Sequence, residues 1–324
     1  MQYFITGCTG FIGSHIAQKI IDSGGKIKAL KRENSDLSSL GSLAEQIEWT
    51  DVNIMDPNNL QEAMQGTDIV IHAAATVSFN PAQKENMFKT NVQGTANIVN
   101  ASLELGIKKF CHISSIAAIG SSEHTLELDE TNKWVNDDLT SPYSESKYLA
   151  EQEVWRGIAE GLEAVIVNPS VVLGVGDWQR SSVKVFNYIT ENPPYYPSGL
   201  LNYVDVRDVS EIVLKLIQSN TTGERFILNA EAIPYRKAFS IMAKHLGAKA
   251  PNKKLPLLLA KVLVKIEAFR AWMANKEPKI TDDLIRSTAK KYYYSNQRIK
   301  HKFGYEFRKL EDTMQWVGKH YNNT

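Results

Sequence analysis

The feature that most constrains the fold of this chain is the alternation, through its first half, of short apolar segments with helix-like ones. Segments such as 14–24 and 59–66 carry apolar residues at helical spacing. Both faces of the short segments are mostly apolar, as in a parallel sheet that helices cover on both sides. The alternation therefore predicts a doubly wound parallel α/β sheet. Its predicted strands are 3–6, 27–30, 47–50, 69–75, 110–114 and 164–170.

The pattern changes after about residue 170. A proline-rich loop at 192–199 is followed by a strand and helix at 202–218 and by another strand at 223–229. From Ala230 onward the pattern is mostly helical. We therefore expect two domains. The first comprises 1–169 plus 202–229, and a smaller, mostly helical one comprises 170–201 plus 230–324.

The most apolar helical stretch is Leu255 to Ala274, and it allows two interpretations. Its cations Lys261, Lys265 and Arg270 fit a helix that lies on a membrane surface. Apolar residues surround most of the stretch, however, which favours a helix packed over a pocket in the second domain.

Composition excludes several classes of protein. The net charge is +1 and no dense basic run occurs, which argues against a nucleic-acid binder. No apolar run approaches the ~18 residues of a membrane span, and the first residues do not resemble a signal peptide. The two cysteines, Cys8 and Cys111, have no metal-ligand spacing. We therefore expect a cytoplasmic protein without a metal site, with both thiols reduced.

A glycine-rich loop, TGCTGFIG at 6–13, lies between the first predicted strand and the first helix. Gly7, Gly10 and Gly13 let the backbone turn tightly and approach a pyrophosphate, which the start of the helix then attracts. The spacing is G-x-x-G-x-x-G rather than G-x-G-x-x-G. Its position nevertheless predicts a Rossmann dinucleotide site. Cys8 in this loop is interpreted as a small residue that a tight turn tolerates.

A tyrosine and a lysine share one face of a predicted helix. Pro142 marks the start of that helix, and Tyr143 and Lys147 follow at i and i+4. A nearby ammonium favours the phenolate, so the pair is suited to acid–base chemistry.

Three neighbouring segments support this interpretation. Ser114 and Ser115 end a predicted strand, at the sheet edge where such folds bind their ligand. Ala73 to Ala75 end another strand in small residues that allow a flat cofactor to approach. Asn91 begins a helix near the same edge.

Together these segments resemble an extended short-chain dehydrogenase/reductase of the epimerase/dehydratase group. The sequence is most similar to its dihydroflavonol-reductase-like and 3β-hydroxysteroid-dehydrogenase-like branch. The motifs occur in the family's order and span nearly the whole chain, although the last ~90 residues match only loosely. They are TGCTGFIG, HAAA, NVQGT, SSIAAIG, YSESK, NPSVVLGVGD and NYVDVRDVS.

The resemblance implies roles for the polar residues. Tyr143 would be the general acid for carbonyl reduction, and Lys147 would bind the nicotinamide ribose and lower the pKa of the phenol. Ser115, five residues before Gly120, would steady the substrate oxygen. Ser114 would be structural, and Asn91 would order a helix or a water relay.

The resemblance also implies cofactor contacts. Asn53 stands where the family usually has an aspartate that contacts adenine, so this contact would be weaker. The cofactor-binding residues would be Gly7, Thr9, Gly10, Phe11, Ile12, Gly13, Asn53, Ile54, Ala73, Ala74, Ala75, Tyr143, Lys147, Pro169 and Val172.

Lys31 and Arg32 bear on the choice of cofactor. They follow the second predicted strand, where an NAD-binding fold would place a carboxylate on the adenosine ribose. A basic pair there predicts NADP, with Arg32 gripping the 2′-phosphate and Ser35 adding a hydroxyl. The alternatives are NAD and a solvated basic turn, which the nearby Glu33 would suit.

Three functions stay open. The favoured one is an NADP-dependent reductase of a ketone or aldehyde on an apolar small molecule. The second is a nucleotide-sugar epimerase or dehydratase with NAD, which would want arginines to clamp a pyrophosphate. The third is a regulator that only senses the dinucleotide. The resemblance also implies a homodimer through helices that begin near Asn86 and Tyr143. Available arginines are Arg236, Arg270, Arg286, Arg298 and Arg308.

Overall fold

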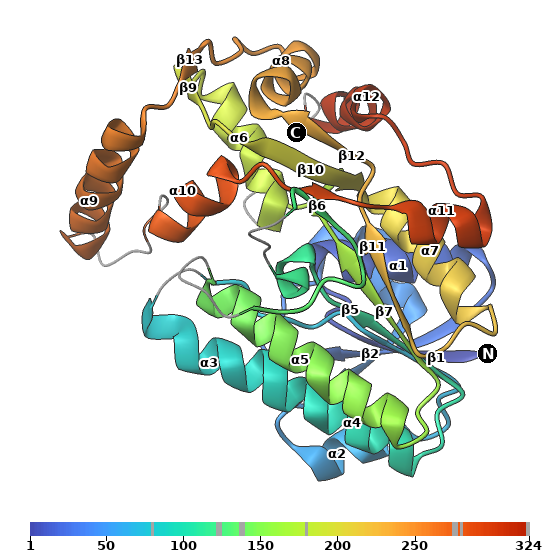
Figure 1. Ribbon diagram of the computed structural model, residues 1–324. Helices are drawn as coiled ribbons and strands as arrows, with labels where there is room; N and C mark the ends of the chain where they lie inside the picture. The colour runs from blue at the N-terminus through green and yellow to red at the C-terminus, as the bar shows by residue number, and fades with distance from the viewer. Residues whose placement is uncertain are drawn as a thin grey trace.

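A seven-stranded parallel sheet forms the centre of the computed structural model (Figure 1). The structure describes residues 1–78, 81–120, 125–135, 140–178, 181–273, 278 and 281–321. The strand order is β11-β7-β5-β4-β1-β2-β3, so the order reverses between β1 and β4. Ligands of such sheets bind beyond the carboxyl ends of the strands at this reversal. The strands are β1 (Gln2–Thr6), β2 (Lys26–Lys31), β3 (Ile47–Asp51), β4 (Ile69–His72), β5 (Lys109–Ile113), β7 (Ala164–Pro169) and β11 (Glu224–Leu228).

Helices cover both faces of this sheet (Figure 1). Alternate residues of each strand serve the two faces: Ile5 packs toward α1 and α7, whereas Phe4 packs toward α4 and α5. Both faces are therefore apolar, as the sequence predicted. The covering helices are α1 (Phe11–Asp22) and α7 (Val206–Ile217) on one side, and α2 (Pro57–Ala63), α4 (Gly94–Glu104) and α5 (Pro142–Ala159) on the other.

A second hydrophobic core lies in the later part of the chain, around a three-stranded sheet of order β12-β10-β8. Helices α6, α8 and α12 pack around it. The elements of this core are β8 (Val171–Leu173), α6 (Lys184–Thr190), β10 (Leu200–Asp205), β12 (Glu231–Pro234), α8 (Tyr235–Leu246) and α12 (Leu310–Tyr321).

The remaining strands and helices lie outside these two groups. Two pairs of short strands, β9 with β13 and β6 with β14, join distant parts of the chain. These elements are α3 (Lys84–Phe88), β6 (Glu127–Leu128), β9 (Tyr195–Tyr196), β13 (Lys253–Lys254), α9 (Leu257–Met273), α10 (Asp282–Ala289), β14 (Tyr293–Tyr294) and α11 (Gln297–Phe303). None of the helices in the described ranges is long and apolar enough to cross a membrane.

The predicted fold class is confirmed, and one detail differs. The fourth predicted strand ends at His72, so Ala73 to Ala75 form a loop rather than strand residues. In the segment 202–229, α7 and β11 lie on the large sheet, and β10 pairs with β8 and β12 in the small one.

Buried carboxylates tie α7 to the end of the chain. Asp205 caps α7 by accepting from the backbone N–H of Arg207 at 2.8 Å. It also accepts from the Arg207 guanidinium at 2.6 Å and from the Thr313 hydroxyl of α12 at 2.7 Å. One fully buried side chain therefore joins the large sheet's helix layer to the second core.

Candidate active site

The glycine loop after β1 lies directly against the loop after β4. Gly7 has a φ of +70°, and a Cβ there would stand 2.6 Å from both the carbonyl carbon of Ala73 and the amide nitrogen of Ala74. A Cβ on Gly13 would come within 2.2 Å of the Gly7 oxygen. A side chain at Gly7 would push the two loops apart, and one at Gly13 would push α1 away from the glycine loop, because backbone atoms cannot yield as a side chain can. The two loops meet beside the strand-order reversal.

The start of α1 fits a phosphate group. Gly10 precedes the helix without a side-chain cap, so the first N–H groups of α1 have no capping side chain among the described residues. The Phe11 ring packs against Gly176, where a Cβ would stand 2.6 Å from the ring. Burial raises the pKa of the Cys8 thiol to about 12, which leaves this cysteine an uncharged packing residue.

A buried histidine fixes the loop after β4. His72 shares a hydrogen bond of 2.7 Å with the Thr6 hydroxyl and one of 2.9 Å with the Thr95 hydroxyl. Thr95 donates its own proton to the Asn91 carbonyl, so His72 Nε2 is the donor toward Thr95. Thr6 in turn donates to Nδ1 and accepts from the Ala74 N–H. Burial lowers the His72 pKa to about 3, so the ring stays neutral in this chain of hydrogen bonds.

Asn91 joins that loop to α5. Its side chain accepts from the Thr76 N–H at 2.7 Å and donates to the Thr76 carbonyl and to the Ser146 hydroxyl, both at 3.0 Å. Ser146 donates to the Tyr143 carbonyl at 2.8 Å. All the polar atoms of this amide are used within the protein. Asn91 therefore orders the site and has no remaining proton to relay.

Tyr143 and Ser115 meet at the carboxyl end of the sheet. Ser141 caps α5 and Pro142 occupies its first turn, which fixes Tyr143 at the start of the helix. The phenol shares a hydrogen bond with the Ser115 hydroxyl, which itself accepts from the Ala117 N–H at 3.1 Å. Burial raises the Tyr143 pKa by more than this hydrogen bond lowers it. Tyr143 therefore keeps its proton at neutral pH.

Lys147 lies one helical turn further along α5 and is 2% exposed. Its ammonium donates to the Ile113 carbonyl at 3.0 Å, at the end of β5. Burial lowers the Lys147 pKa to about 8, although the Glu151 charge opposes that shift. The sequence predicted that Lys147 lowers the Tyr143 pKa. In the structure the balance differs, because burial raises that pKa.

Glu151 is a completely buried carboxylate that the sequence analysis did not single out. It accepts from the Asn168 amide at 2.5 Å and pairs with Arg225 at 3.3 Å. The same Asn168 nitrogen donates to the Ser115 carbonyl at 2.9 Å. Glu151 thus supports Lys147 by charge and Ser115 through Asn168. Its spacing of four residues from Lys147 is the signal that could have found it.

Two hydroxyls at neighbouring strand ends are buried without a partner. Among described residues, nothing accepts from or donates to Ser114 Oγ, after β5, or Ser170 Oγ, after β7. Pro169 ends β7 beside them, and Val172 is packed in the core next to the large sheet. Unpaired buried hydroxyls at this edge are the feature that a bound polar ligand would satisfy.

Asn53 and Ile54 follow β3 near α4. The side-chain oxygen of Asn53 accepts a hydrogen bond of 3.0 Å from the Met55 N–H. This oxygen is therefore already used in a local turn. Ile54 packs 3.3 Å from the place where a Cβ on Gly94 would stand. Asn97 of α4 donates to the Ile54 carbonyl at 2.9 Å.

The two cations after β2 differ in their surroundings. Lys31 forms an ion pair of 2.8 Å with Asp51, its register partner on β3. Arg32 is exposed, and its guanidinium has no hydrogen-bond or ion-pair partner among the described residues. Its backbone N–H donates to the Ser35 hydroxyl at 2.9 Å, which holds the turn. Only Arg32 presents an uncommitted charge.

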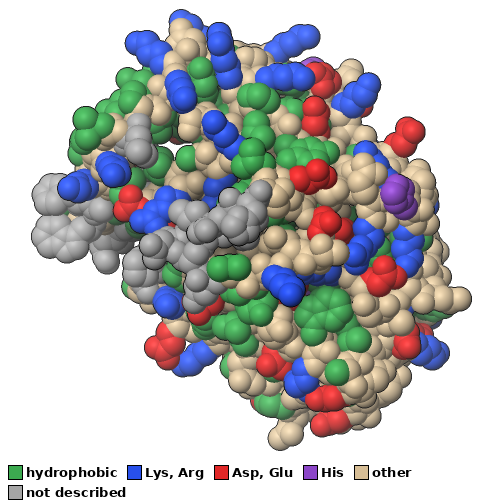
Figure 2. Space-filling model, viewed as in Figure 1, with side chains coloured by type: hydrophobic (Ala, Val, Ile, Leu, Met, Phe, Trp, Pro, Cys, Tyr) green, Lys and Arg blue, Asp and Glu red, His purple; other side chains and the backbone are tan. Residues whose placement is uncertain are grey.

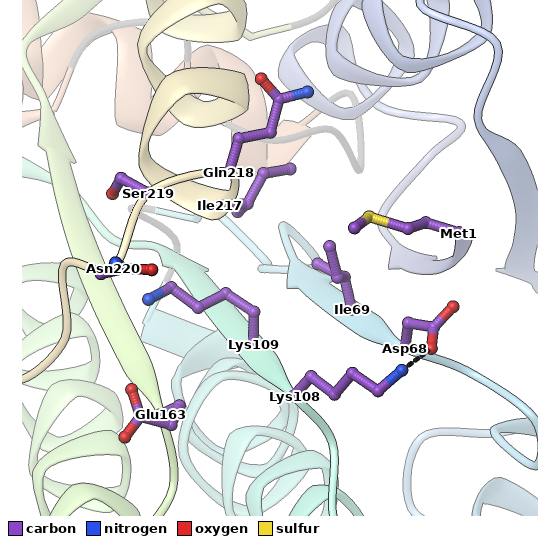
Figure 3. A pocket seen from close by; sticks show the side chains of 10 residues that line it. All are labelled: Met1, Asp68, Ile69, Lys108, Lys109, Glu163, Ile217, Gln218, Ser219 and Asn220. Carbon is purple, nitrogen blue, oxygen red and sulfur yellow. Dashed lines mark hydrogen bonds and ion pairs between the residues drawn. The ribbon is translucent and has the colours of Figure 1, made fainter.

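A separate pocket of about 380 Å³ opens at the opposite edge of the sheet, at the amino ends of β4 and β5 (Figure 3). Its lysines already have protein partners: Lys108 pairs with Asp68 at 2.7 Å, and Lys109 donates to the Thr221 carbonyl. This pocket lies away from Tyr143 and from the glycine loop.

Known proteins resemble the chain over nearly its full length. A provisionally named dihydroflavonol 4-reductase of Synechocystis sp. is 29% identical over 98% of this chain and 95% of its own. Cinnamoyl-CoA reductase 1 of Petunia hybrida is 26% identical over 94% of this chain and 86% of its own. The crystal structure of gox2253 is 31% identical, with a TM-score of 0.83 over 99% of this chain and 97% of its own.

The sheet, the glycine loop and the Tyr143–Lys147 helix define a Rossmann-fold enzyme that uses a nicotinamide dinucleotide on a small-molecule substrate. The sequence model of the NAD dependent epimerase/dehydratase family matches residues 3–229. The chain belongs to this family, and the predicted resemblance is confirmed. Its general reaction class is that of the NAD(P)-dependent reductases, dehydrogenases and epimerases.

Proposed function

We propose that the protein is an NADP-dependent reductase that converts a ketone or aldehyde on an apolar substrate to the alcohol. The observation that carries this proposal is the buried Tyr143 phenol, which is hydrogen-bonded to Ser115. Burial raises the pKa of this phenol. A phenol that holds its proton is suited to donate it to a carbonyl oxygen as negative charge develops there. Residues 170–201 and 230–324 would form most of the substrate-binding part.

Each residue of the site would have its own role in carbonyl reduction. NADPH would supply the hydride, held by the glycine loop, the Ala73–Ala75 loop, Lys147 and the ends of β5 and β7. Ser115 would donate to the carbonyl oxygen and hold it beside the phenol. Tyr143 would then transfer its proton to that oxygen. Lys147 would stabilise the phenolate that remains, because its ammonium lies on the same helix face.

The arginines of the later chain argue against the nucleotide-sugar alternative. Arg270 is bound to Glu267 at 2.7 Å, Arg298 lies 3.7 Å from Glu130, and Arg308 is bound to Glu211 at 2.8 Å. A guanidinium already paired with a carboxylate must break that pair before it can clamp a pyrophosphate. Arg236 and Arg286 are exposed. A reductase of an apolar substrate needs no such clamp.

The choice of NADP rests on Arg32. The guanidinium is exposed at the end of β2 and has no partner in the part of the chain that the structure describes, and no carboxylate occupies position 31 or 32. A 2′-phosphate would gain two charge-assisted hydrogen bonds from it. Lys31 would contribute less, because Asp51 already neutralises its charge.

Titration of both cofactors tests this choice. Arg32→Ala should lower NADPH affinity by ~10-fold or more, about 1.4 kcal/mol per decade, and leave NADH affinity nearly unchanged. Lys31→Ala should have a smaller effect. Lys28→Ala is the matched control, since Lys28 lies on the same strand and pairs with Glu48 at 3.6 Å. A wild-type protein that binds NADH as tightly as NADPH would refute the assignment.

We also propose a homodimer, on the family resemblance and on the arrangement of two helices. α4 and α5 pack side by side on one face of the molecule (Figure 1). Their outward sides carry polar groups such as Asn100 and Gln152, and Arg156 donates to Asn100 at 2.8 Å. Two copies of this face could pair as a four-helix layer.

A further inference from the structure

Helix α9 (Leu257–Met273) exposes large apolar side chains along one side. Leu258 is 78% exposed, Ile266 is 58% and Met273 is 69%, and Val262 between them is 45% exposed. At about 100° per residue, these four positions fall within about 80° of one another around the helix axis. Soluble proteins rarely leave such a continuous apolar stripe uncovered.

The opposite side of α9 faces the protein. Ala260 and Ala271 are 2% and 3% exposed. Both lie about 150° or more around the axis from the centre of the stripe. Among described residues, the inward side also carries the half-buried Leu263 and Val264, so α9 contacts the protein with apolar residues and still leaves the stripe exposed. The interpretation of this segment as a helix whose apolar residues cover a pocket does not account for the outward stripe.

Cations flank the stripe. Lys261 and Lys265 are exposed on one side of it, and Arg270 is exposed on the other. Lys253 and Lys254 of β13 are also exposed, a few residues before the helix. The one acidic residue of α9, Glu267, lies on the inward half and is bound to Arg270 at 2.7 Å. Figure 2 shows hydrophobic side chains with lysine and arginine side chains among them along the outer left edge, over α9.

We propose that α9 docks the protein on an anionic lipid bilayer, lying flat with its apolar stripe among the acyl chains. An exposed apolar stripe with lysines beside it can enter the interface of a bilayer, where the lysines reach back to the headgroups. Each cation near an anionic surface strengthens the attraction. A second copy of the same face would bring the lysines of both helices together, so self-association is disfavoured. This inference does not depend on the proposed reductase activity.

Sedimentation with vesicles tests the proposal. The whole protein should bind vesicles that contain about 30% phosphatidylglycerol and bind pure phosphatidylcholine vesicles much more weakly, with the difference shrinking in about 0.5 M salt. Leu258→Glu with Ile266→Glu should weaken binding by ~10-fold or more. Lys261→Glu with Lys265→Glu should abolish the preference for anionic lipid.

Matched controls separate docking from misfolding. Lys300→Glu with Lys309→Glu makes the same charge change on exposed lysines outside α9, and Leu126→Glu makes the same apolar-to-acid change at a residue that is 64% exposed. Both should bind vesicles like the wild type, and every variant should keep its unfolding temperature. The proposal is overturned by absent binding to anionic vesicles, by equal binding to neutral ones, or by unchanged binding of the α9 variants. A dimer that Ile266→Glu dissociates would instead identify a second copy as the occupant.

Discussion

Tyr143 and Ser115 bring a proton donor and a supporting hydroxyl into contact at the carboxyl end of the sheet. Tyr143→Phe keeps the ring and removes the transferable proton, so turnover should fall by at least ~100-fold with cofactor affinity nearly unchanged. Steady-state kinetics with an aldehyde or ketone panel and cofactor titration measure the two effects. Tyr148→Phe on the same helix is the control, because Tyr148 stacks on Trp134 at 4.5 Å and should retain activity.

Replacing each of two adjacent serines tests whether Ser115 or Ser114 supports the substrate oxygen. Ser115→Ala should reduce turnover about as much as Tyr143→Phe, whereas Ser114→Ala should have a much smaller effect. Ser114 has no bond to the phenol, and its hydroxyl has no partner among described residues. The reverse order of effects would show that Ser114 supports the substrate oxygen.

Glu151 should set the pH at which Lys147 loses its charge. Glu151→Gln removes the negative charge that raises the Lys147 pKa, so the ammonium should lose its proton below the present value of about 8. If protonated Lys147 is required, reduction falls as pH rises through this pKa. The alkaline limb of the kcat/KM profile should therefore move to lower pH in the variant. An unmoved limb in a folded variant would show that Glu151 acts only through Asn168.

At the scale of elements, the start of α7 joins the two cores. Asp205→Ala removes the helix cap, the partner of the Arg207 guanidinium and the acceptor for Thr313. Because the half-buried Arg207 guanidinium and two further donors lose a buried acceptor together, the free energy of unfolding should fall by about 3 kcal/mol. Urea unfolding followed by circular dichroism measures it. Asp312→Ala, at an exposed position of α12, should change stability by less than about 0.5 kcal/mol.

At the scale of the whole molecule, the proposed dimer can be tested by measuring its mass in solution. The chain has a mass of 36.4 kDa, so light scattering after size exclusion should give twice that value in detergent-free buffer. Gln152→Arg would add a like charge beside its own copy in a face-to-face pairing of α5, and it should shift the mass toward one chain. A wild-type mass of one chain would contradict the dimer.

The sequence by itself determined the fold class and the order of the site along the chain. Apolar runs with both faces buried specify a covered parallel sheet wherever they occur, and six predicted strands correspond to β1 to β5 and β7. The glycines of the first loop could also be recognised from the sequence, since a Cβ on Gly13 would collide with the backbone of Gly7, six residues earlier. Such constraints act within a few residues, so local pattern is sufficient to recognise them.

The tertiary structure alone decided which side chains act on one another. Lys31 forms an ion pair with Asp51, twenty positions later in the sequence, because β2 and β3 place the two residues side by side. Glu151 of α5 contacts Asn168 of β7 and Arg225 of β11. The raised Tyr143 pKa likewise follows from burial, which packing sets and sequence spacing does not. Partners brought together by folding leave no local pattern, so only the three-dimensional arrangement could reveal them.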